Sequence, residues 1–196
     1  MSILLDAGPA LNFLAVGQQN ALLETAQQAK LQLSAPERVD IEVRRQVKQP
    51  RFRSTAAAGT WTKLISAGHL EVLTDDLNVA AFTQAVTRVS GVPANQRVKQ
   101  TASLGEIMVI AHASMQAQLG APVFVLIDEG DGRRRAKGEA RWLTRQPSVH
   151  GSLVLWDTKR VLQHAASAGW LLGQKSWEQV FNEMCGFDDG LTRLPK

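Results

Sequence analysis

Four acidic residues stand where the sequence predicts the ends of buried elements. Asp6 ends a short apolar run at the start of the chain, and Asp128 ends the strongest strand pattern in the sequence. Glu42 and Glu106 lie in the first turns of two predicted helices. Carboxylates that converge repel one another unless a cation neutralises them. Because these ligands are hard oxygens without His or Cys, they suit Mg²⁺ or Mn²⁺. Magnesium held by carboxylates and waters is the usual catalyst of phosphodiester hydrolysis.

The same acids also have a structural interpretation. Asp6 is well placed to cap the helix that follows it, and acids near helix starts interact favourably with the helix dipole. The spacing of the residues does not distinguish helix caps from a metal site. The fourth acid is itself open among three neighbours: Asp128, Glu129 and Asp131.

Histidine and cysteine patterns offer little competing chemistry. His112 follows Glu106 by six residues, which turns it to another helix face about 9 Å further along the axis. The remaining three of the four histidines have no partner at a catalytic spacing. The single cysteine, Cys185, excludes a disulfide within the chain, and we expect it to be a small buried apolar residue.

Alternating strand and helix patterns predict the elements that must hold the acids. This alternation indicates an α/β fold, a three-layer α/β/α sandwich with a central, mostly parallel five-stranded sheet. Adjacent parallel strands lie about 4.8 Å apart, so their carboxyl ends would bring Asp6 and Asp128 together. The predicted strands cover residues 2–6, 30–34, 69–73, 123–127 and 149–155.

Local signals between these strands predict how the helices begin. Pro36 is expected at the first position of one helix, and Asp76 is expected to cap another that runs to about Val89. Residues 94–103 are polar and predict an exposed loop. The sequence Gly130-Asp131-Gly132 lacks the Lys and Ser/Thr of a phosphate-binding loop and favours a tight turn.

Length and composition indicate one folded domain. The 196 residues, 44% of them hydrophobic, are enough for an ordinary core. We expect a helical and strand insertion at about 48–100 and a helical extension at about 157–196. The N-terminus lacks a signal-like pattern, and no apolar run approaches about 18 residues. A cytoplasmic, soluble protein is therefore expected.

Basic residues gather close to the predicted acids in the sequence. The net charge of +4 favours an anionic partner. Three arginines at positions 133–135 begin a predicted helix, where positive charge opposes the dipole, and this favours a role facing an anion. The residues expected to bind a nucleic-acid backbone are Arg44, Arg45, Lys48, Arg51, Arg53, Arg133 and Arg134.

Taken in order, these segments resemble the PIN-domain nucleases. The matching pieces are residues 4–10, 35–42, 105–113, 127–136 and 149–155, and they span most of the chain. The resemblance implies an α/β/α sandwich and a metal-dependent single-strand endoribonuclease. It further implies that Asp6, Glu42, Glu106 and Asp128 are the catalytic acids, with Mg²⁺ (or Mn²⁺) bound by Asp6, Glu106 and Asp128.

Many bacterial members of this family resemble the VapC toxins of toxin–antitoxin pairs. The partners expected from the resemblance are RNA, an antitoxin protein and a second copy of the chain. The chain departs from the small toxins mainly through its greater length at 48–100, and Ser103 stands where a further acid often precedes Gly-Glu. A catalytically inactive module that binds nucleic acid or protein on the same fold is the alternative. A dinucleotide-binding protein is disfavoured because the first strand-helix turn lacks the glycine pattern.

Overall fold

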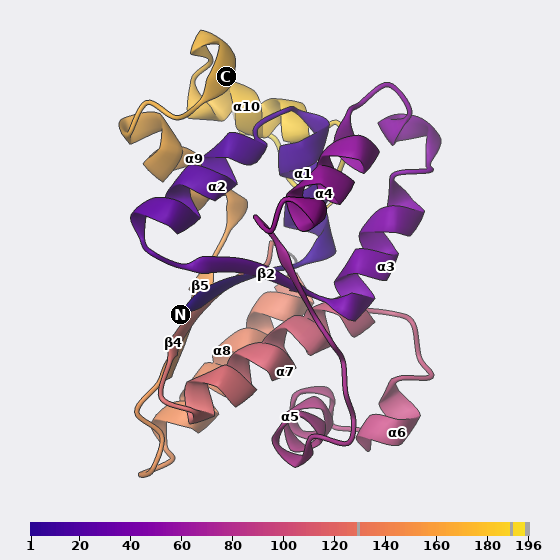
Figure 1. Ribbon diagram of the computed structural model, residues 1–196, viewed down its shortest axis with the longest axis vertical. Helices are drawn as coiled ribbons and strands as arrows, with labels where there is room; N and C mark the ends of the chain where they lie inside the picture. Colours follow the sequence, from indigo (N-terminus) through magenta and orange to yellow (C-terminus); the bar gives the residue numbers. More distant parts are fainter. Residues whose placement is uncertain (129, 189, 195–196) are drawn as a thin grey trace.

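A five-stranded parallel sheet forms the centre of the computed structural model, which describes residues 1–128, 130–188 and 190–194. All neighbouring strands pair in parallel, and helices cover both faces (Figure 1). The predicted three-layer α/β/α sandwich is thereby confirmed. In the sheet order β3-β2-β1-β4-β5, the strands are β1 (Ser2–Leu5), β2 (Gln32–Pro36), β3 (Glu71–Leu73), β4 (Pro122–Leu126) and β5 (Ser152–Trp156).

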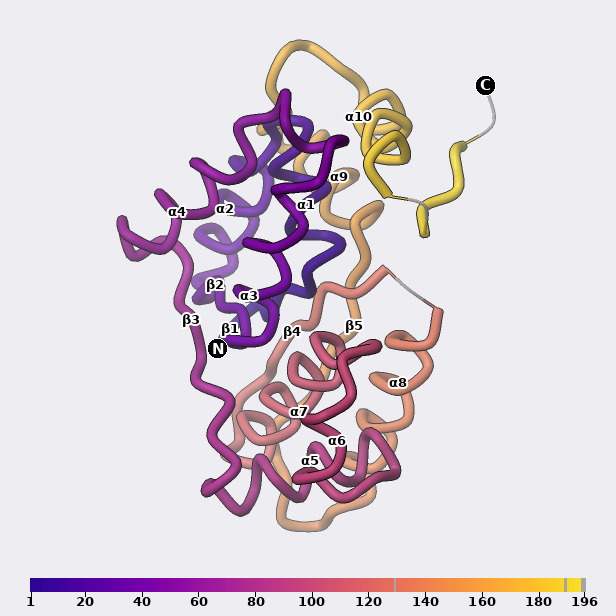
Figure 2. The backbone as a smooth tube through the Cα atoms, turned by 90° about the vertical axis from the view of Figure 1, so that its right-hand side faces the viewer, coloured from indigo at the N-terminus to yellow at the C-terminus, as the bar shows by residue number. Residues whose placement is uncertain are grey.

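The helices divide between the two faces of the sheet, as Figure 2 shows. One face carries α1 (Ala7–Ala15), α2 (Gln19–Gln28), α4 (Ala57–Ser66), α9 (Thr158–Ser167) and α10 (Trp177–Met184). The other carries α5 (Ala80–Ser90), α6 (Ala94–Arg97), α7 (Leu104–Gln118) and α8 (Gly130–Thr144). Helix α3 (Glu37–Gln46) contacts both α1 and α7, and the short 3-10 turns are η1 (Pro50–Phe52) and η2 (Leu172–Gln174).

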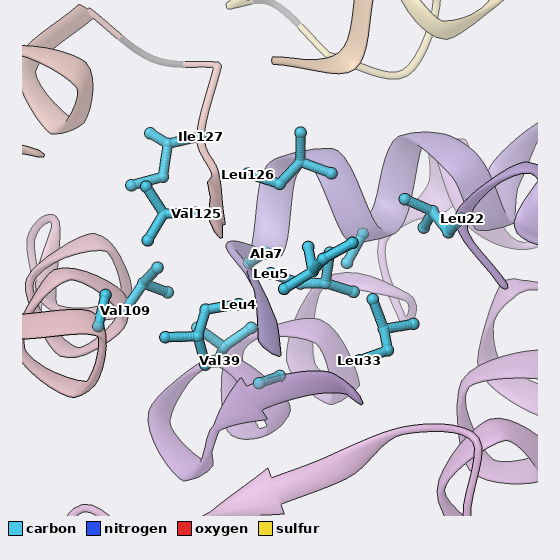
Figure 3. Close-up of a cluster of buried hydrophobic side chains, with 14 of the residues drawn as sticks. Leu4, Leu5, Ala7, Leu22, Leu33, Val39, Val109, Val125, Leu126 and Ile127 are labelled. Atoms are coloured by element: carbon cyan, nitrogen blue, oxygen red, sulfur yellow. The ribbon is translucent and has the colours of Figure 1, made fainter. Parts of the chain in front are cut away.

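The core follows the two-residue period of the strands. Leu4 of β1 pairs with Val125 of β4, and both side chains lie on the side of α7 (Figure 3). Leu5 pairs with Leu126, and these two point to the opposite side, towards α1 and α2. Because both faces of the sheet are covered, residues 3–5 of β1 and 123–126 of β4 are apolar on both sides, as expected for a parallel sheet.

The chain order creates a crevice between β1 and β4. From β1 the chain runs through α1 and α2 to β2 on one side, whereas from β4 it runs through α8 to β5 on the other. The crossover helices lie on opposite faces, as right-handed connections require. Ligands of open α/β sheets bind outside the carboxyl ends of the strands where the order diverges in this way. In this sheet, that place is the end of β1, next to Asp6.

The structure corrects the predicted start of α3. Pro36 is the last residue of β2, with an extended ψ of 152°, and the helix begins one residue later at Glu37. The strand is accordingly shifted from the predicted 30–34, because Lys30 lies in a turn with a φ of 54°. Glu42 is the sixth residue of α3 and lies in its second turn, so its predicted place in the first turn is wrong.

Three further local predictions are wrong. The carboxylate of Asp76 accepts a hydrogen bond from the N–H of Asn78 at 2.8 Å, which makes a turn, and α5 begins only at Ala80. Residues 94–97 form α6 instead of an exposed loop, and Arg97 is only 6% exposed because its guanidinium donates to the carbonyls of Gln100 and Ala102. Residues 130–132 form the first turn of α8, not a tight turn.

The expected insertion and extension pack against the same sheet. Within residues 48–100, β3 adds the edge strand beside β2, and α5 packs on α7. In the extension, α9 packs against α2, and α10 packs against α9. Within the part of the chain that the structure describes, no helix combines the length and apolar character needed to cross a membrane.

Candidate active site

Three of the four predicted acids line one cavity at the carboxyl edge of the sheet. Asp6 follows β1 directly, Glu42 lies in the second turn of α3, and Glu106 lies in the first turn of α7. The cavity has a volume of about 270 Å³. Asp6 and Glu106 are buried, with 6% and 5% of their surfaces exposed, whereas Glu42 is half-buried. Three elements far apart in the sequence therefore bring carboxylates to one place.

Two glycines leave the room that these carboxylates occupy. A Cβ on Gly105 would lie 3.0 Å from Oε2 of Glu42 and 3.5 Å from Oδ1 of Asp6, so both oxygens lie close to one point. A Cβ on Gly132 would lie 2.7 Å from Oε2 of Glu106, closer than real contacts allow. Any side chain at these two positions would press on the acids.

Asp128 lies at the expected edge of the sheet but does not line this cavity. The prediction that Asp6 and Asp128 follow adjacent parallel strands is confirmed, because β1 pairs with β4 and the N–H of Asp6 donates to the carbonyl of Leu126 at 3.2 Å. The carboxylate of Asp128, however, accepts hydrogen bonds from the N–H and the hydroxyl of Thr158 at 2.8 and 2.6 Å. It lines a second cavity, of about 320 Å³. Its role as a metal ligand remains a prediction.

The alternatives for the fourth acid have different surroundings. Asp131 lies in the first turn of α8 and pairs with Arg134 and Arg135, and the hydrogen bond from Arg135 lowers the pKa of Asp131. Glu129 lies outside the described residues. Neither of the acids on this segment that the structure describes, Asp128 and Asp131, lines the cavity of Asp6.

Asp188 takes a place in the cavity that the sequence did not predict. It lies in the segment after α10, and its Oδ2 accepts a hydrogen bond from the side chain of Asn12 at 2.6 Å. The ring of Phe187 stacks on that of Phe52, with centroids 5.7 Å apart. No local pattern marks Asp188, because its partner is 176 residues away. The sequence offered one weak signal: Asp188 is an acid without an assigned role in the predicted C-terminal extension.

A neutral amide and a positively charged guanidinium also line the cavity. Gln46 donates to Oε1 of Glu42 at 2.9 Å, and Arg51 also lines the cavity. Four carboxylates thus face one guanidinium among the lining residues that the structure describes. The cavity lining comprises Asp6, Ala7, Gly8, Leu11, Asn12, Glu42, Gln46, Arg51, Phe52, Ser103, Gly105, Glu106, Phe187, Asp188 and Gly190.

The predicted backbone-binding residues divide into paired and exposed groups. Arg44 pairs with Asp40 at 2.8 Å, and Arg133 pairs with Asp157 at 3.3 Å and donates to the carbonyl of Ile127. Arg134 pairs with Asp131, which relieves the unfavourable charge at the start of α8. Arg45, Lys48 and Arg53 are exposed at the surface, and Arg51 is the only one of the predicted seven that lines the acidic cavity.

The donor set of the cavity fits a hard divalent cation. Its acids are oxygen ligands, and burying several of them together is unfavourable without a positive partner. Over residues 1–128, 130–188 and 190–194, no three acidic, histidine or cysteine side chains stand close enough together to enclose an ion. Mg²⁺ usually keeps several waters and takes one or two carboxylates directly, so it does not require such an enclosure.

Comparisons of this chain with protein-family models, with curated proteins and with solved structures find no match. The functional argument therefore depends on the site.

Proposed function

We propose that the protein is a Mg²⁺- or Mn²⁺-dependent endoribonuclease that hydrolyses phosphodiesters of single-stranded RNA. The observation that carries this proposal is the meeting of Asp6, Glu42 and Glu106 in one cavity at the divergence of the sheet order. These acids come from three separate elements, and helix capping does not explain why they share a cavity. The order of the matching segments supports the same class, because it resembles the PIN-domain nucleases.

Each acid has a role that follows from its position. Asp6 and Glu106, the two buried acids, are proposed to hold the ion, together with Asp128 if its carboxylate leaves Thr158. Bound Mg²⁺ or Mn²⁺ supplies positive charge and lowers the pKa of a water molecule. Glu42, held by Gln46 beside Asp6, is placed to orient that water. Arg51 at the cavity wall supplies positive charge to an RNA phosphate.

The alternative is an inactive module that binds nucleic acid or protein. One observation favours it: Asp128, the fourth predicted acid, is engaged by Thr158 outside the cavity. Under this alternative the exposed arginines still bind RNA but no cleavage occurs. On the resemblance to VapC toxins we further propose an antitoxin protein as partner and self-association of the chain. A small DNA-binding protein encoded beside this gene would support the toxin assignment.

The test is the metal dependence of cleavage on a mixed pool of single-stranded RNA. The proposal predicts cleavage with Mg²⁺ or Mn²⁺, none with a chelator, and recovery when the ion is returned. Matched duplex RNA serves as a control and should be cut more slowly. An RNA pool that binds but stays intact with either ion would favour the inactive module.

A further inference from the structure

A second cavity lies at the same edge of the sheet as the acidic cavity. It has a volume of about 320 Å³, and two of its lining residues, Asp128 and Asp157, come shortly after the ends of β4 and β5. Gly190 lines both cavities, so the two meet at the C-terminal segment. They are therefore neighbouring parts of one surface along the carboxyl ends of the strands.

The two cavities differ in the balance of their charges. Among the described residues of the second cavity, two acids accompany two cations, Arg133 of α8 and Lys159 of α9. The described lining of the acidic cavity has four carboxylates and one guanidinium. Because like charges repel, a phosphate group meets less repulsion in the second cavity than in the first.

Both acids of the second cavity already have donors. Thr158 donates to the two oxygens of Asp128 at 2.8 and 2.6 Å. Asp157 accepts from the N–H of Arg160 at 2.9 Å and pairs with Arg133 at 3.3 Å. Arg133 uses Nη1 for that pair and for a bond to a backbone carbonyl. Because a guanidinium has five N–H donors, those on Nε and Nη2 remain to bind an anion.

Lys159 brings a second positive charge to this cavity from the first turn of α9. Its Nζ lies 5.0 Å from the centre of the Phe181 ring, and Phe181 lines the same cavity. Over residues 1–128, 130–188 and 190–194, Lys159 forms no ion pair. An exposed lysine is often only solvated, but the contact with the ring holds this ammonium group at the wall of a cavity that adjoins the acidic one.

We propose that the second cavity binds a second phosphate of the RNA strand, through Lys159 and Arg133. The proposal rests on the proposed function, which puts the cleaved phosphate beside Asp6. It adds the path of the strand, from the acidic cavity past Gly190 to the ends of β4 and β5. A phosphate contact of this kind fixes the register of the strand without reading its bases.

The test is the binding of a fluorescent oligouridylate to the full chain, measured by anisotropy with a chelator present so that no cleavage occurs. Lys159→Gln should weaken binding several-fold and flatten the log–log slope of affinity against salt by roughly 0.7, the value for one phosphate contact on a single strand. Lys159→Arg keeps the charge and should bind as the wild type does. The matched control is Lys63→Gln, which removes an exposed lysine of α4 outside both cavities and should leave the slope unchanged.

Two further probes identify the ligand. Oligoadenylate should lose affinity by the same factor as oligouridylate on Lys159→Gln, because the contact is to phosphate; a loss confined to one of the two would overturn the phosphate assignment. Uridine monophosphate has a phosphate but no neighbouring nucleotide. If it bound the wild type as tightly as the oligomer does, the cavity would hold a small phosphorylated molecule, and the path of the strand would be wrong.

The outcomes separate this proposal from the proposed function, which metal-dependent cleavage tests by itself. Equal salt slopes for Lys159→Gln, Lys63→Gln and wild type would overturn the second phosphate site and leave cleavage by the acids standing. RNA binding that depends on Lys159, in a chain that does not cleave with Mg²⁺ or Mn²⁺, would overturn the proposed function and leave the phosphate site standing. A wild type that does not bind oligouridylate even at low salt would overturn this proposal.

Discussion

The carboxylate of Asp128 joins the end of β4 to the start of α9. Both of its oxygens accept hydrogen bonds from Thr158, one from the backbone N–H and one from the hydroxyl. Burial raises the pKa of Asp128 above its ordinary value of 3.8, and the two hydrogen bonds from Thr158 oppose that rise. The contact therefore stabilises the junction while the buried charge costs stability.

Replacing Asp128 separates these two effects. Asp128→Ala should destabilise the protein by about 1–3 kcal/mol, because the buried N–H of Thr158 is left without its acceptor. Asp128→Asn should be close to neutral or stabilising at pH 7, since its amide can accept from the N–H and donate to the hydroxyl. Urea unfolding of both variants measures the difference. Equal stability of the two would show that the hydrogen bonds contribute little.

The pH dependence of the same pair has a definite sign. Because the pKa is raised in the folded state, the folded protein binds the proton more tightly than the unfolded chain. The stability gained from protonation is complete below 3.8 and is lost as pH rises through the folded-state pKa. The advantage of Asp128→Asn over wild type should therefore grow from pH 4 to pH 7, and a constant difference would contradict the raised pKa.

At the scale of elements, helix α8 contains one glycine in open space and one that is closely packed against other side chains. A Cβ on Gly138 would meet nothing within 4 Å, whereas one on Gly132 would meet Glu106 and Ile127 at under 3.0 Å. Alanine in an open helix position is more stable than glycine by about 1 kcal/mol. The two positions thus allow a comparison within one helix.

Gly138→Ala should raise the free energy of unfolding by up to about 1 kcal/mol. Gly132→Ala should not show that gain, because the new methyl group displaces the Glu106 side chain, and its Mn²⁺ affinity should fall. Chemical denaturation and metal titration of both variants give the answer. If Gly132→Ala matched Gly138→Ala in both measurements, the close packing of α8 on Glu106 would be wrong.

The sequence predicted the elements better than their ends. The apolar runs at 3–5 and 123–127 identified β1 and β4, because a parallel strand buried on both faces reads as an apolar segment, whereas the alternation of residues 30–34 identified β2. The predicted start of α3 at Pro36 was wrong because the fixed φ of proline suits both a first helical position and an extended strand end. The prediction for Arg97 was wrong because a polar segment predicts exposure. The carbonyls that accept hydrogen bonds from its buried guanidinium belong to a turn that no local pattern reveals.

The candidate site was predictable only where an acid ends or belongs to a recognisable element. Asp6 follows β1 directly, Glu42 and Glu106 lie within predicted helices, and these elements bring the three acids to one cavity. Asp188 does not, because its position depends on Asn12 and Phe52, far away in the sequence. A contact between residues 176 positions apart is set by the tertiary fold and leaves no local pattern in the sequence.

At the scale of the whole molecule, the chain has a net charge of +4, whereas its cavity at the sheet edge is lined by four carboxylates and one guanidinium among the residues that the structure describes. Arg51 lies at the cavity and Arg53 is exposed two residues further on. Under the proposed function, these arginines would neutralise phosphates of RNA bound at the cavity, and such binding depends steeply on salt. Charge near the cavity should therefore matter more than the same charge elsewhere.

The double variant Arg51→Ala/Arg53→Ala should weaken RNA binding by a similar factor for different sequences. The log–log slope of affinity against salt should flatten by roughly 0.7 for each phosphate that the variant no longer neutralises. The charge-matched control is Arg141→Ala/Arg145→Ala, which removes two exposed arginines at the far end of α8. Identical slopes for the two double variants would mean that Arg51 and Arg53 do not touch phosphates.

The central claim is that the acids around Asp6 hydrolyse RNA with a divalent ion. The most direct measurement compares Mn²⁺-dependent cleavage of end-labelled single-stranded RNA by wild type, Asp6→Asn and Glu24→Gln, an exposed acid on α2 that serves as control. We predict cleavage by wild type and Glu24→Gln, without 2′,3′-cyclic phosphate ends because water and not the RNA 2′-hydroxyl is the nucleophile, and no cleavage by folded Asp6→Asn. Undiminished cleavage by Asp6→Asn, or 2′,3′-cyclic phosphate products, would contradict the account.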